Sequence, residues 1–89
     1  MDRKTRIEAR LRAVFAPSAL EVIDDSSRHA GHAGAAVGGE THYSVRITAY
    51  AFEGASRVAR HRLVFDALKD EFAGGLHALA IDAAAPKRA

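Results

Sequence analysis

Histidine is the residue type in this sequence that is best suited to metal or proton chemistry. Five histidines occur among 89 residues and there is no cysteine, so the chain has no thiolate ligand, thiol nucleophile or disulfide of its own. Neutral imidazole is a common ligand for borderline metals, and its charge changes near neutral pH. What chemistry is available therefore depends on where the fold places His29, His32, His42 and His77.

An amphipathic helix is expected near the N-terminus and is stopped by Pro17. Its apolar stripe at helical spacing consists of Ile7, Leu11, Val14 and Phe15. A capping box of Thr5 and Glu8 is one candidate for the start of this helix, and Asp2 is a rival cap.

A second helix is expected from Ser56, which can cap it, to about Phe72, and Gly74-Gly75 ends it. Its apolar stripe consists of Val58, His61, Phe65, Leu68 and Phe72. Because His61 lies in the middle of that stripe, it is interpreted as a partly buried, hydrogen-bonded residue and not as a ligand.

Three segments are expected to be strands, at residues 20–24, 41–50 and 76–83. The second has the clearest pattern, because apolar and polar residues alternate along it as in a half-buried strand. Its inward positions are Tyr43, Val45, Ile47 and Ala49. Residues 25–39, rich in glycine, alanine, serine and histidine, are expected to form a long loop of a length that is often functional.

The order αββαβ predicts one α+β domain over residues 1–89, with residues 1–4 and 84–89 frayed. The first two strands should form a hairpin, and a right-handed crossover should place the third strand parallel to the second. A three-stranded mixed sheet with both helices packed on one face would then bury a single core.

This topology brings four histidines to one edge of the sheet. His29 and His32 lie on the long loop, His42 begins the second strand and His77 begins the third. The arrangement favours a metal site at that edge. The alternative is that the loop histidines are solvated, that His42 pairs across strands and that His77 is a satisfied, half-buried residue.

The charged residues suggest a partner surface but no enzyme. The net charge of +2 is too small to indicate nucleic-acid binding by itself. Arg57, Arg60 and Arg62 lie in the first half of the second helix, where the helix dipole disfavours cations, so they are either solvated or face an anionic partner. Helical phase predicts Arg60 and Leu63 on the outer face. The chain has no catalytic constellation and no apolar run long enough to span a membrane, and a cytoplasmic location is expected.

Several segments together resemble the BolA family over most of the chain. They are LEVIDDS (20–26), RH (28–29), GETHY (39–43), FEG (52–54), RHRLVF (60–65) and LHALAI (76–81). The resemblance implies an αββαβ fold similar to the type II KH domain and a partnership with a monothiol glutaredoxin carrying a Cys-Gly-Phe-Ser site. Alone, such a chain is expected to be a monomer or a weak homodimer.

The same resemblance implies a [2Fe-2S] cluster shared in the complex, for which the glutaredoxin cysteine and glutathione supply sulfur. The implied ligands on this chain are His77 and the loop residue His29, with His32 as a second candidate in the loop. Iron–sulfur cluster assembly, trafficking or iron regulation is then the expected function. DNA-binding transcriptional regulation through the basic second helix is the alternative, and a metal-free adaptor is a third hypothesis.

Overall fold

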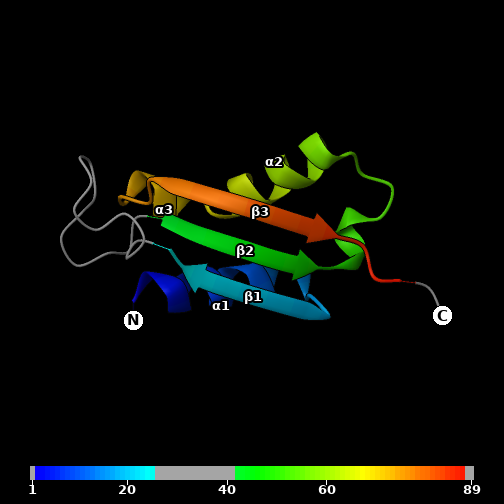
Figure 1. The fold of residues 1–89 in the computed structure, drawn as a ribbon, viewed down its shortest axis with the longest axis horizontal. Helices are drawn as coiled ribbons and strands as arrows, with labels where there is room; N and C mark the ends of the chain where they lie inside the picture. The colour runs from blue at the N-terminus through cyan, green and yellow to red at the C-terminus, as the bar shows by residue number, and fades with distance from the viewer. Residues whose placement is uncertain (1, 26–41, 88–89) are drawn as a thin grey trace.

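The computed structural model describes residues 2–25 and 42–87. The elements follow the expected αββαβ order, except that the second helix is divided in two. They are α1 (Arg3–Phe15), β1 (Ala19–Asp24), β2 (His42–Thr48), the 3-10 helix η2 (Tyr50–Phe52), α2 (Arg57–Ala67), α3 (Lys69–Ala73) and β3 (Ala78–Ala84) (Figure 1). The prediction of an α+β fold is confirmed. None of the helices described is long and apolar enough to cross a membrane.

α1 begins one turn earlier than the capping box predicted. Asp2 is the N-cap, and its carboxylate accepts a hydrogen bond from the backbone N–H of Thr5 at 2.9 Å. Hydrogen bonding from Thr5, first from its side chain and then from this backbone N–H, holds the pKa of Asp2 below its usual value. The capping box of Thr5 and Glu8 was therefore the wrong choice of the two. The helix ends as predicted just before Pro17, with Ala16 in the left-handed conformation.

β2 is the central strand of a sheet with the order β1-β2-β3. β1 pairs antiparallel with β2, and β3 pairs parallel to β2. The parallel pairing predicted for the last strand is thus confirmed. In this register His42 lies opposite Ala78, so the first residues of β2 and β3 lie at the same end of the sheet.

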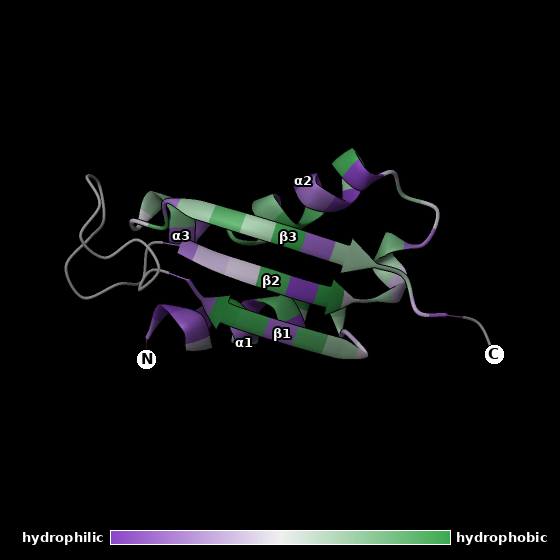
Figure 2. Cartoon of the chain, in the orientation of Figure 1, coloured by the Kyte–Doolittle hydropathy of each residue, from purple (hydrophilic) through white to green (hydrophobic). Residues whose placement is uncertain are grey.

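The core lies between the helices and one face of the sheet (Figure 1). The alternation predicted for β2 is confirmed, because Tyr43, Val45, Ile47 and the following Ala49 are at most 2% exposed. Their buried partners on the helical side include Ile7, Leu11, Phe15, Val64 and Leu68. The opposite face is polar at its centre, where exposed Arg46 lies 3.9 Å from Glu21 and 3.7 Å from Asp82 (Figure 2).

The apolar stripe predicted for the second helix is confirmed at Leu68 and wrong at Val58 and Phe65. Val64 and Leu68 are buried, whereas Val58 is 60% exposed and Phe65 is 40% exposed. The predicted stripe ran along one continuous helix from Ser56 to about Phe72. The structure breaks the helix at Leu68, so Phe72 belongs to α3 and does not report the phase of α2. The predicted cap is confirmed, since Ser56 accepts a hydrogen bond from the N–H of Ala59.

Candidate functional site

His77 is exposed on the short connection between α3 and β3. His77 was predicted to lie inside the last strand, but β3 begins one residue after it, at Ala78. The ring of His77 lies beside that of His42, with the centroids 5.4 Å apart and the planes inclined by 46°. His42, the first residue of β2, is half-buried. The structure therefore brings together two of the four histidines that were expected to converge.

The two histidines predicted in the long loop, His29 and His32, lie outside the described residues, so their roles stay predictions. The chain on either side of residues 26–41 is described. The backbone N–H of Asp25, just after β1, donates to the carbonyl of His42 at 2.7 Å. The loop is thus joined to the sheet at the end where His42 and His77 lie.

A shallow groove runs beside this pair of rings. It is lined by Asp25, His42, Tyr43, Ala78, Leu79 and Ala80. The hydroxyl of Ser44 donates a hydrogen bond to the carboxylate of Asp25, which ties the end of β1 to β2. Within residues 2–25 and 42–87, no three histidine, cysteine or acidic side chains are grouped so that they could hold a metal ion. At this end of the sheet, the described part of the chain therefore offers two imidazoles, those of His42 and His77.

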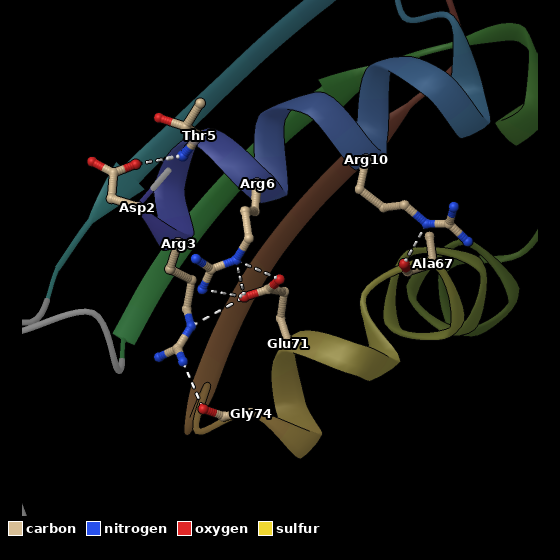
Figure 3. A network of polar contacts seen from close by, with 8 residues as sticks. All are labelled: Asp2, Arg3, Thr5, Arg6, Arg10, Ala67, Glu71 and Gly74. Carbon is tan, nitrogen blue, oxygen red and sulfur yellow. Dashed lines mark hydrogen bonds and ion pairs between the residues drawn. The ribbon is translucent and has the colours of Figure 1, made fainter.

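A cluster of charged residues anchors the connection that carries His77 (Figure 3). Glu71 of α3 accepts hydrogen bonds from Arg3 at 3.2 Å and from Arg6 at 3.0 Å, both on α1. Arg3 also donates to the carbonyl of Gly74 at 2.8 Å, and the N–H of Leu76 donates to the carbonyl of Glu71 at 2.8 Å. These bonds fix the backbone on the N-terminal side of His77.

The same cluster lowers the pKa of Glu71 and holds Arg3 in the first turn of α1. The hydrogen bond from Arg6, followed by that from Arg3, holds the pKa of Glu71 below its usual range, although burial opposes this shift. Residues 1–4 were expected to be frayed. That expectation is wrong for Arg3, which is in α1 and mostly buried by these contacts.

The absence of a side chain at Gly75 leaves room for the guanidinium of Arg3 in the same cluster. Its φ of +119° is rarely adopted by other residues, and a Cβ built there would lie 3.3 Å from a guanidinium nitrogen of Arg3. The predicted helix stop at Gly74-Gly75 is confirmed, and it also leaves room for Arg3. No pattern in the sequence linked Arg3 to Glu71, because spacing rules apply within one element and not between distant ones.

The predicted partner surface on α2 is only partly as expected. Arg57, Arg62 and Leu63 are exposed, and Leu63 is on the outer face as predicted. Arg60 is half-buried, and it donates to the carbonyls of Ala55 and Ala83, each at 3.0 Å. The outer-face placement of Arg60 was therefore wrong, because its guanidinium joins α2 to β3.

His61 is half-buried, as predicted, but it belongs to a second, open cleft. This cleft lies between α2 and β3 and is lined by Ala55, Arg57, Arg60, His61, Ile81, Asp82 and Ala83. It combines cationic side chains with the carboxylate of Asp82. Such a mixed lining suits a polar contact better than a purely anionic ligand.

Comparisons with known proteins agree on one family. The family model described as BolA-like protein matches residues 11–88. An uncharacterized protein in the cobS 5′ region of Sinorhizobium sp. is 53% identical over 87 residues, covering 97% of this chain and 94% of that protein. The DNA-binding transcriptional regulator BolA of Escherichia coli K12 is 40% identical over 78 residues, covering 88% of this chain and 70% of that protein.

A solved structure gives the same result for the fold. The BolA domain of SufE1 from Arabidopsis thaliana superposes with a TM-score of 0.87 at 48% identity, covering 97% of this chain and 94% of that domain. The chain spans only 24% of the length of the full SufE-like protein 1 of that plant. With sequence and structure matched over almost its whole length, the chain belongs to the BolA family.

Proposed function

We propose that this chain is a non-enzymatic adaptor that pairs with a monothiol glutaredoxin in the cytoplasm and helps to hold a shared [2Fe-2S] cluster. The observation that carries the proposal is the position of His77. Its imidazole is exposed at the end of the sheet, beside His42 and next to the points where the long loop joins β1 and β2. Because His77 is exposed at the edge of the sheet, a second protein can supply the remaining ligands of a metal site there.

The residues present fit such a cluster. The chain has no cysteine, so sulfur ligands must come from a partner, while His77 can supply nitrogen. Imidazole ligands are known on one iron of [2Fe-2S] centres and raise their reduction potential. A bound cluster would supply one-electron chemistry or transferable iron and sulfur. His29 or His32 would provide the second ligand from this chain.

The chain's own contribution is to hold His77 in place. Arg3 and Glu71 anchor the connection before His77, and the pairing of Ala78 with His42 fixes the backbone after it. The backbone on both sides of the ligand is therefore fixed before any partner binds. Preorganised ligands lose less conformational freedom when a site is completed.

Co-expression of the full chain with a monothiol glutaredoxin in iron-replete cells tests this proposal. The expected result is a co-purified heterodimer with visible absorption of a [2Fe-2S] cluster and bound glutathione. A heterodimer that stays colourless after anaerobic reconstitution would support the metal-free adaptor instead. No association of the two proteins would overturn the proposal.

DNA binding is the second candidate function. The Escherichia coli relative is named a DNA-binding transcriptional regulator, and exposed Arg57 and Arg62 could contact phosphates here. Against this, Arg60 is occupied by two backbone carbonyls, and the turn at residues 52–54 has no Gly-x-x-Gly loop. Titration with duplex DNA at two salt concentrations decides the matter. Direct binding would weaken with log salt at a slope of about 0.9 per phosphate contacted.

A further inference from the structure

We propose that His42 and His77 together form a two-imidazole site for a borderline divalent cation such as Zn²⁺ in the isolated chain. The two rings lie side by side at the end of the sheet, with centroids 5.4 Å apart. This site needs neither a glutaredoxin nor an iron–sulfur cluster. It goes beyond the proposed function and does not rest on it.

The distance between the rings matches the geometry of a shared ion. A zinc–nitrogen bond of about 2.1 Å places the metal about 3.2 Å from each ring centroid, and a tetrahedral angle then separates the two centroids by about 5.2 Å. The observed separation is 5.4 Å. The separation of the rings thus suits a common ion when the side chains turn so that one nitrogen of each ring points to it.

The backbone under both rings is fixed by contacts described above. His42 lies in β2 opposite Ala78, the residue that follows His77, and its carbonyl accepts a hydrogen bond from Asp25. On the other side of His77, Arg3 and Glu71 hold the chain at Gly74 and Leu76. Binding of a cation would therefore order two side chains and leave the backbone unchanged.

The donor set also indicates which kind of ion binds and how. Imidazole suits zinc, copper and nickel, whereas hard cations such as magnesium prefer oxygen ligands. Since no third histidine, cysteine or acidic ligand joins the pair in the described residues, the remaining positions on the ion are left to water or an outside ligand. Such a site is an exchangeable one and not a closed structural zinc centre.

Calorimetric titration of the isolated chain with Zn²⁺ tests the site. The expected result is binding of one equivalent, with affinity reduced more than about tenfold in both His42→Ala and His77→Ala, since even loss of a residue outside the ligand set typically weakens metal binding 10- to 100-fold. His61→Ala is the matched control and should bind as the unaltered chain does. The double variant His29→Ala/His32→Ala should also keep its affinity.

Ring signals of the unaltered chain in NMR spectra give a second measurement that needs no substitution. Those of His42 and His77 should shift together with Zn²⁺, and that of His61 should not. If His42→Ala does not fold, His42→Gln replaces it. The proposal is overturned if the unaltered chain binds no Zn²⁺, if either single variant keeps its affinity, or if the loop double variant loses it. Because no glutaredoxin is present, none of these outcomes tests the proposed cluster.

Discussion

Arg3 donates a hydrogen bond of 2.8 Å to the carbonyl of Gly74 and so connects the first turn of α1 to the end of α3. The same side chain pairs with Glu71, one turn earlier on α3. Because His77 follows three residues after Gly74, the start of the chain helps to position a proposed ligand far along the sequence.

Glu71→Gln is expected to lower the free energy of unfolding by about 1 kcal/mol at pH 7, since it removes the charge that pairs with Arg3 and Arg6. The pKa of Glu71 is lowered in the folded protein. Its stabilising effect is therefore fully present above the pKa of the unfolded state and is lost as pH falls through the folded-state pKa. Urea unfolding of both proteins from pH 7 to pH 3 should show their difference shrinking with acid.

Asp70→Asn is the matched control for this substitution, because Asp70 is an exposed carboxylate next to Glu71 on α3. It should change the stability at pH 7 by less than about 0.5 kcal/mol. A stability difference for Glu71→Gln that is equally large at pH 3 and pH 7 would show that the ion pairs are not its cause.

The corrected phase of α2 predicts opposite outcomes for two identical substitutions. Val64→Ala removes fully buried methyl groups and should cost about 2 kcal/mol, the sum of lost burial and a residual cavity. Val58→Ala lies at an exposed helical position and should change stability by at most about 0.5 kcal/mol. Thermal or urea unfolding distinguishes the two. A larger loss for Val58→Ala than for Val64→Ala would support the stripe that was predicted from the sequence, and equal losses would contradict the difference in burial.

Arg60→Ala should destabilise the fold by about 1–3 kcal/mol, because it removes two hydrogen bonds from a charged donor to the carbonyls of Ala55 and Ala83. Arg57→Ala, on the exposed side of the same helix, should be close to neutral. Urea unfolding measures both. If Arg60→Ala leaves the free energy of unfolding unchanged, the two hydrogen bonds of Arg60 do not stabilise the fold. Tests of a DNA or protein contact on α2 should use Arg57 and Arg62, which are exposed.

His77→Ala should fold normally, because the side chain is exposed, but should greatly reduce cluster retention in a glutaredoxin complex. His29→Ala is expected to have a smaller effect, since His32 could replace it. Visible absorption and circular dichroism of the purified complexes measure both effects, with His61→Ala as the control. Cluster absorption and lifetime that do not change in His77→Ala would remove His77 from the proposed ligand set.

The sequence was sufficient to predict the sheet but not the rotation of α2. Alternation in β2 has a period of two and survives small errors in its bounds, so Tyr43, Val45 and Ile47 were assigned to the core correctly. The prediction of which helix face is buried is more sensitive to where the helix ends. Leu68 is buried and Phe72 packs against the core, but α2 ends at Leu68. The stripe continued back along α2 therefore included exposed Val58 and Phe65 and omitted buried Val64.

The candidate site was also predicted only in part, because contacts between elements distant in the sequence were missed. Topology alone predicted that His42 and His77 lie at one end of the sheet, because parallel strands begin at the same edge. The anchoring of His77 by Arg3 and Glu71 was not predicted, since it depends on how α1 and α3 pack against each other. The second role of Arg60 was missed for the same reason.

The direction of β3 also determines where this domain can be tethered. β3 starts beside His42 and ends at Ala84, opposite Thr48, about 20 Å away at the rise of a β-strand (Figure 1). A fusion partner or surface linker attached after residue 87 would therefore leave from the end remote from the histidine pair and would not block it. One attached before Asp2 would emerge beside Arg3, close to the chain that leads into His77.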